Sequence, residues 1–245
     1  MRRGFISNKN PDDPPARYSD PRHLNWLPFP HTTPGQPQRF NLQRQSKVLV
    51  FAFMGRHIFR RLYETAADFD TDPFRSYSKV CVHGTAGTGK SHVLAALACL
   101  LTHEGKRVVY VPDCILLIES FFIEMRSALQ FAFPEHATMM DSWSDNEQIR
   151  DFCRAWRKSG TIFFVLDQRE ALDTFPDDPD KDRKSQVRIC LDELLSRNYV
   201  AYSASAESKT HRVRPGQRSN IKEFAMLTGF EEVCTNLIYI QLPCV

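Results

Sequence analysis

The residues best suited to chemistry form the segment GTAGTGKS, which fits the pattern G-x-x-x-x-G-K-[ST]. Gly84, Gly87 and Gly89 allow the backbone to turn its amides inward and to lie close to an anion. Lys90 would reach the β- and γ-phosphates of a nucleotide, and the Ser91 hydroxyl would ligate Mg²⁺. An ordinary glycine-rich turn does not require a Lys–Ser pair at this spacing. We therefore predict a phosphate-binding loop made of Gly84, Thr85, Ala86, Gly87, Thr88, Gly89, Lys90 and Ser91.

A second group must hold the metal, and Asp167 is the candidate. It follows the apolar run IFFVL, 77 positions after Lys90. An aspartate at the end of a buried strand is a weak signal alone, but beside a phosphate loop it predicts a Mg²⁺ ligand, direct or through water. The next residue is Gln168, where a catalytic glutamate is common. Because glutamine orients a water but cannot take its proton, we expect slow hydrolysis or a nucleotide switch.

Other candidates for catalysis are less specific. Glu170 and Asp173 are alternative bases, and Ser205, or Ser203, could hydrogen-bond the γ-phosphate or the attacking water. Serines at a strand end are equally consistent with a turn. A later basic segment could supply an arginine finger, in cis or from another subunit, although a solvated loop is the simpler interpretation. Its basic residues are Lys209, Arg212, Arg214 and Arg218.

The elements that would position these residues alternate along the chain. Short apolar runs without polar alternation predict parallel strands, and patterns of period 3.6 predict the helices between them. Strands are expected around SKVCVH, RVVYVP, TIFFVLD and YVAYSAS, with EFAML or LIYIQL as a fifth. Helices are expected after Gly55–Arg56, over 91–105, 114–131 and 144–160 (Ser144 as its N-cap), and over SQVRICLDELLSRN. The predicted fold is a three-layer α/β/α domain with a parallel sheet covered on both sides.

Residues 1–46 differ in composition from the rest. Eight of the 15 prolines precede residue 38, and seven Arg or Lys residues but no acidic residue lie between Asp20 and Glu64. We predict a disordered, basic arm before a domain over 47–230 and a short tail over 231–245. A nucleic-acid tether is conceivable, but a solvated linker is the better interpretation, and the net charge of +3 does not by itself imply nucleic-acid binding.

Neither a secretory signal nor a membrane span is expected. The N-terminus has no apolar core, and the most hydrophobic window, 114–133, contains Glu119, Glu124 and Arg126. Seven cysteines without a CxxC pair favour a reduced compartment. We therefore expect an intracellular protein, cytoplasmic or nuclear.

Several of these motifs together resemble the AAA+/STAND branch of P-loop NTPases. They are Gly55–Arg56, the phosphate loop, FFVLDQREAL and YSASAES. More narrowly, DQ-x-x-AL and SAS look like the NTPase domain of Crinkler-type and retrotransposon-hot-spot-like proteins, over roughly residues 48–230. The resemblance implies that the phosphate-loop strand lies between the fourth and fifth strands, and that Gly55 and Arg56 contact adenine. It also implies a C-terminal lid or effector region, for which the 15 residues after Phe230 would leave no room.

The leading hypothesis is a Mg²⁺-dependent ATP-binding protein with slow ATPase activity, acting with a protein partner or as a homo-oligomer. No guanine-recognition signature of the N/TKxD type is present, so ATP is favoured over GTP. Two alternatives remain open: an interaction module that nucleotide merely stabilises, and a P-loop kinase. The kinase is the weaker one, because neither an acceptor site nor an arginine-rich lid is evident.

Overall fold

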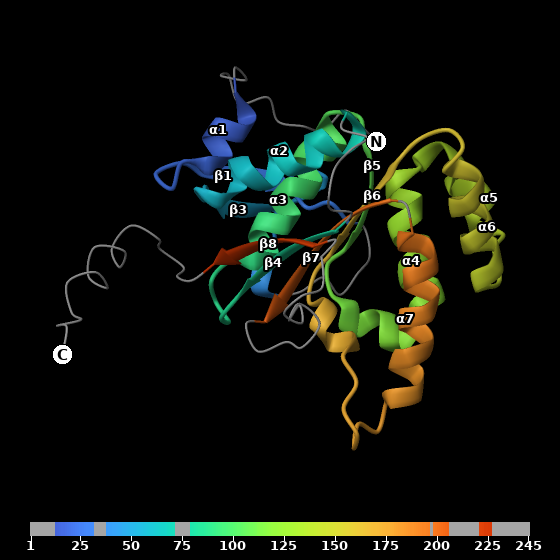
Figure 1. The fold of residues 1–245 in the computed structure, drawn as a ribbon. Coiled ribbons are helices and arrows are strands. Elements are labelled where there is room, and N and C mark those ends of the chain that lie inside the picture. Colours follow the sequence, from blue (N-terminus) through green and yellow to red (C-terminus); the bar gives the residue numbers. More distant parts are fainter. Residues whose placement is uncertain (1–12, 32–37, 72–78, 197, 206–220, 227–245) are drawn as a thin grey trace, which may run out of the picture.

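The computed structural model describes most of the chain, namely residues 13–31, 38–71, 79–196, 198–205 and 221–226. Figure 1 shows a central sheet with helices on both of its faces and a small second sheet beside it. The LIYIQL and tail predictions, and the basic segment with Lys209, Arg212, Arg214 and Arg218, lie outside the described residues.

The central sheet has five strands within the described residues, and all of its pairings are parallel. Its strands are β4 (Lys79–Gly84), β5 (Arg107–Val111), β6 (Ile162–Leu166), β7 (Tyr199–Ser205) and β8 (Ile221–Met226). Their order across the sheet is β5-β6-β7-β4-β8. The strand that precedes the phosphate loop therefore lies between the fourth and fifth strands of this sheet, as predicted. Of the two candidates for the fifth strand, EFAM forms part of β8.

Helices cover both faces of the sheet, and each layer has its own apolar core. One face carries α2 (Ile58–Thr71) and α3 (Lys90–His103). The other carries α4 (Cys114–Ala132), α5 (Ala137–Asp141), α6 (Asn146–Trp156) and α7 (Lys181–Leu195), with short 3-10 turns η2 (Pro134–His136) and η3 (Arg169–Leu172). Strand β6 is buried at every position because both layers press on it. The predicted three-layer α/β/α fold is confirmed.

The prediction of a disordered arm over residues 1–46 is wrong for the described residues of that segment. They form α1 (Pro14–Ser19), β1 (Leu24–Pro28), η1 (Gln38–Phe40) and β2 (Gln43–Gln45), and they continue into β3 (Val48–Met54). The strands make an antiparallel sheet of order β1-β3-β2. Phe29, Phe40 and Phe51 pack their rings together, and Phe29 also contacts Tyr110 of β5. This aromatic packing on the main domain outweighs the proline-rich composition that suggested disorder.

Two local details complete the fold. Helix α6 begins after Asp145 rather than Ser144, because the Asp145 carboxylate accepts from the amides of Glu147 and Gln148 in a capping box. Helix α4 packs its apolar residues into the second core, as expected for the segment 114–131. No helix in the described ranges is long and apolar enough to cross a membrane.

Candidate nucleotide-binding site

The phosphate loop joins the carboxyl end of β4 to the start of α3. Three of its positions need glycine for different structural reasons. A Cβ on Gly84 would lie 2.2 Å from the carbonyl oxygen of Met226 in β8, so this position must be glycine for the sheet to close. Gly87 has a φ of +78° in open space, and Gly89 has a φ of +89°. Both angles lie in the left-handed region that favours glycine. The glycines therefore permit both strand pairing and the turn of the loop.

The start of α3 is arranged to receive an anion. Its N-cap is Gly89, and no side chain caps the first-turn amides. The Lys90 ammonium donates to the carbonyls of Gly84 and Thr85, at 2.8 Å each, so it lies against the loop. Thr88 holds the turn by donating to the Thr85 carbonyl at 2.9 Å. Uncapped amides and the positive end of the helix dipole make this a site for phosphate oxygens.

Asp167 lies directly after β6, at the same edge of the sheet, with no exposed surface. Strand β7 separates β6 from β4, so the two sites are about 10 Å apart at the level of the backbone. Oδ1 accepts from the Ser203 hydroxyl and, at 3.1 Å, from the Gln168 amide. Oδ2 accepts from the Arg39 guanidinium at 2.8 Å. The predicted metal ligand is thus a buried carboxylate with a donor on each oxygen.

The two serines of β7 have separate positions. Ser203 is buried, donates to Asp167, and accepts from the Gln168 amide at 2.8 Å. It therefore orients Asp167, a role that sequence reasoning did not assign to it. Ser205 pairs with Gly84 across β7 and β4, which places it at the base of the phosphate loop. Its predicted contact with a phosphate or a water stays a prediction.

Glu170 is a carboxylate that lies within electrostatic reach of the phosphate loop. It interacts with Lys90 and Asp167, and the Ser205 backbone hydrogen-bonds to it. Burial is the main reason why the pKa of Glu170 is raised, and the charge of Asp167 adds to this. Gln168 has a φ of +57°, and its Oε1 is buried without a hydrogen-bond partner in the described structure. Of the residues that follow β6, Glu170 is the better candidate base.

Gly55 and Arg56 directly follow β3, and Arg56 lies close to the phosphate loop. The Arg56 guanidinium is close to Gly89: a Cβ there would lie 3.2 Å from it. Its charge also contributes to lowering the pKa of His92, for which burial is the main cause. Gly55 packs against the backbone of Asp20, where a Cβ would lie 2.1 Å from the carbonyl oxygen. Arg56 therefore lies beside the phosphate loop, Gly55 is required by chain packing, and their predicted contact with adenine stays a prediction.

The donor set fits a Mg²⁺ ion that is held partly by nucleotide. The described residues contain no group of three His, Cys, Asp or Glu side chains that would form an all-protein metal site. Mg²⁺ is usually bound by one or two protein oxygens together with phosphates and waters. The Asp167 carboxylate and the Ser91 hydroxyl would be such a pair, although the Arg39 guanidinium is already bonded to Asp167.

Two charged residues of the site were not among those predicted from the sequence. Arg39 comes from η1, 128 positions before Asp167. Asp113, the N-cap of α4, interacts electrostatically with both Arg39 and Asp167, and burial raises its pKa. Its position after the strand RVVYVP could have marked it, because carboxyl ends of parallel strands share one edge.

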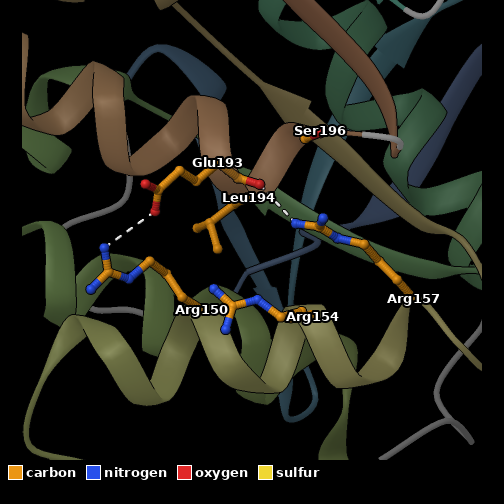
Figure 2. Close-up of a pocket in the computed structure, with 6 residues that line it drawn as sticks. All are labelled: Arg150, Arg154, Arg157, Glu193, Leu194 and Ser196. Atoms are coloured by element: carbon orange, nitrogen blue, oxygen red, sulfur yellow. Dashed lines mark hydrogen bonds and ion pairs between the residues drawn. The ribbon is translucent and has the colours of Figure 1, made fainter.

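A separate hollow of about 300 Å³ lies between α6 and α7 (Figure 2). It lies near the amino ends of β6 and β7, opposite the phosphate loop, and Figure 2 labels its lining residues Arg150, Arg154, Arg157, Glu193, Leu194 and Ser196. Glu193 pairs with Arg150 at 3.2 Å and accepts from Arg157 through its carbonyl at 2.7 Å. Arg154 pairs with Asp151. These guanidinium groups are already paired within the chain.

No protein-family model matches the chain, and no curated protein matches it. Among solved structures, PCH-2 from C. elegans matches at 15% identity, with a TM-score of 0.40, over 86% of this chain and 50% of that one. AMPPCP-bound DnaA from Aquifex aeolicus matches at 16% identity and a TM-score of 0.34, over 67% of this chain and 44% of that chain. The chain thus spans about half the length of the first of these structures.

The class of protein follows from the sheet order and the loop. A parallel sheet of order β5-β6-β7-β4-β8, with a G-x-x-x-x-G-K-S loop between β4 and α3, is a P-loop NTPase fold. A buried Asp167 after β6 lies at the carboxyl edge where such folds bind their ligands.

Proposed function

We propose that the chain binds ATP with Mg²⁺ at the phosphate loop and hydrolyses it slowly, as a nucleotide switch of the AAA+/STAND type with Crinkler-like motifs. The observation that carries this proposal is the meeting of three groups at one sheet edge: Lys90, Asp167 and Glu170. They combine a phosphate-binding cation, a metal ligand and a candidate base.

Each group has a defined part in the proposed reaction. The amides of the loop and Lys90 bind the β- and γ-phosphates. Ser91 and Asp167 would hold Mg²⁺, and the bound ion would neutralise negative charge on the transferring phosphoryl group. Ser203 keeps Asp167 in position. Glu170 accepts a proton from the attacking water, and its raised pKa makes it a stronger base than an exposed carboxylate.

Binding is the first test. Isothermal calorimetry with ATP and with GTP, each with and without Mg²⁺, should show tighter binding of ATP when Mg²⁺ is present. Lys90→Ala should abolish tight triphosphate binding and leave the circular dichroism spectrum unchanged, because the Lys90 ammonium bonds loop carbonyls and not the core. If Lys90→Ala binds ATP as well as the parent chain, the nucleotide-binding proposal is wrong.

Turnover tests the assignment of Glu170. Phosphate release should fall by about 10²-fold or more in Glu170→Gln, the usual contribution of a positioned general base. The affinity for ATP should stay close to that of the parent. A Glu170→Gln protein that hydrolyses ATP at the parental rate would remove Glu170 from the mechanism. Tight binding without turnover in the parent would favour the alternative, an interaction module that nucleotide stabilises.

A further inference from the structure

Arg39 occupies the oxygen of Asp167 that has no other partner among the described residues. Its guanidinium donates to Oδ2 at 2.8 Å and also to the carbonyl of Pro112. The second oxygen, Oδ1, is already bonded by Ser203 and by the Gln168 amide. A metal ion that approaches Asp167 therefore meets a carboxylate with a donor of the chain already bonded to each of its oxygens.

The position of Arg39 is set by the core and not by the surface. The next residue, Phe40, is 2% exposed, and its ring contacts Phe29, Phe51 and His92. This packing anchors η1 beside the first turn of α3. The Arg39 side chain itself is 27% exposed, and its Nε is buried without a hydrogen-bond partner in the described structure. The backbone of Arg39 is therefore fixed by the packing of Phe40, whereas its guanidinium does not use all of its hydrogen-bond donors.

Mg²⁺ bound at Oδ2 of Asp167 would lie directly beside the Arg39 guanidinium. A guanidinium and Mg²⁺ at one carboxylate oxygen would repel each other strongly in a buried, weakly screened place. We propose that Arg39 is a built-in counter-cation, which holds Asp167 in the nucleotide-free protein and must be displaced when Mg²⁺ and nucleotide bind. This inference rests on the proposed function, because it assumes that Asp167 is the metal ligand.

Other groups beside Arg39 can bind its guanidinium after it leaves Asp167. Asp113 interacts electrostatically with Arg39, and Pro112 accepts a bond from it already. On the other side, His92 faces Arg39 and has its pKa lowered mainly by burial, so it adds little charge at neutral pH. Arg39 can therefore leave Oδ2 while remaining beside Asp113 and close to the first turn of α3, where the phosphates would bind.

The test compares Arg39→Met with Arg44→Met. Arg44 lies on β2 in the same segment, is exposed, and provides a control with the same loss of charge. The fluorescence of an N-methylanthraniloyl ATP analogue would report binding in EDTA and at rising Mg²⁺. We expect Arg39→Met to lower the half-saturating Mg²⁺ concentration by about tenfold, the scale of one charge-assisted hydrogen bond. Affinity in EDTA should fall, because a positive charge near the phosphates is lost.

The half-saturating Mg²⁺ concentration and the affinity in EDTA should thus both fall in Arg39→Met, and neither should move in Arg44→Met. An unchanged or increased Mg²⁺ requirement in Arg39→Met would overturn the proposal. If Arg39→Met does not fold, Arg39→Gln provides the same comparison, since glutamine also removes the charge but keeps a polar side chain that can bond the Pro112 carbonyl. Failure of the parent chain to bind the analogue under any condition would instead refute the proposed function.

Discussion

The ion pair between Arg39 and Asp167 should be measurable as a coupling in the free energy of unfolding of the nucleotide-free protein. The perturbation is a double-mutant cycle with Arg39→Met and Asp167→Asn. Methionine keeps much of the length of the arginine stem, and asparagine keeps the shape of the carboxylate. The cycle isolates the pair from the effects of each single change.

The structure sets the expected magnitude. Removal of one partner of a buried ion pair costs about 3–5 kcal/mol. Arg39 is 27% exposed, and Asp167 keeps its bonds from Ser203 and the Gln168 amide, so Arg39→Met should cost about 3 kcal/mol, at the lower end of that range. In the Asp167→Asn background the same change should cost only about 1 kcal/mol, the worth of an ordinary hydrogen bond. The expected coupling is therefore about 2 kcal/mol.

Urea denaturation of the four proteins, followed by circular dichroism, gives the required free energies, provided that each unfolds in two states. If the free energy of unfolding falls with urea concentration at the same slope in all four proteins, their unfolded states are comparable. A coupling below about 0.5 kcal/mol, the usual limit of additivity, would mean that the two side chains do not interact as described. The proposed competition with Mg²⁺ would then lose its structural basis.

Two further predictions concern residues outside this pair. Gln168→Glu should raise the rate of phosphate release by less than about tenfold, because Glu170 already supplies a carboxylate near Lys90. A positioned base would give about 10²-fold or more. A gain of that size would show that the residue at position 168, and not Glu170, acts as the base. His31 is buried, and burial lowers its pKa from 6.5 to about 4. The folded protein therefore keeps His31 neutral while the unfolded chain takes up a proton below about pH 6.5, so stability should decline between pH 6.5 and 4 by about 3 kcal/mol from this residue. His31→Gln should reduce this loss of stability at low pH, as measured by urea denaturation at several pH values. An equally steep loss in the variant would show that His31 is not its cause.

The main domain could be predicted from sequence because its signals are local. Buried strands such as β6 are apolar at every position, and the phosphate loop needs a rare combination of glycines, Lys90 and Ser91. The place of Asp167 at the carboxyl edge of the sheet could be predicted because it directly follows the apolar run of β6. The predicted start of α6 is wrong by one residue, because Ser144 and Asp145 are both good N-caps and the structure uses Asp145.

The parts that sequence reasoning missed depend on contacts between distant segments. The small sheet β1-β3-β2 is stabilised by packed rings, one of which, Phe29, contacts Tyr110, and a proline-rich composition gives no sign of such packing. Arg39 reaches Asp167 across 128 positions, a separation that no local pattern records. The choice between Gln168 and Glu170 depends on a turn in which Gln168 takes a φ of +57°, which glutamine rarely adopts.

The antiparallel sheet also changes where the folding unit begins. Phe29, Phe40 and Phe51 belong to the same apolar core as most of α3, so the sheet and the phosphate-loop helix bury each other. A fragment cut at residue 47, where the motifs suggest that the domain starts, would lose two of these rings and leave Phe51 and the flank of α3 open to water. Such a fragment would present an exposed apolar patch and would leave both edges of β3 unpaired, the combination that leads to aggregation. Aggregation of a shortened protein would then reflect a divided core, not an intrinsically unstable nucleotide-binding domain.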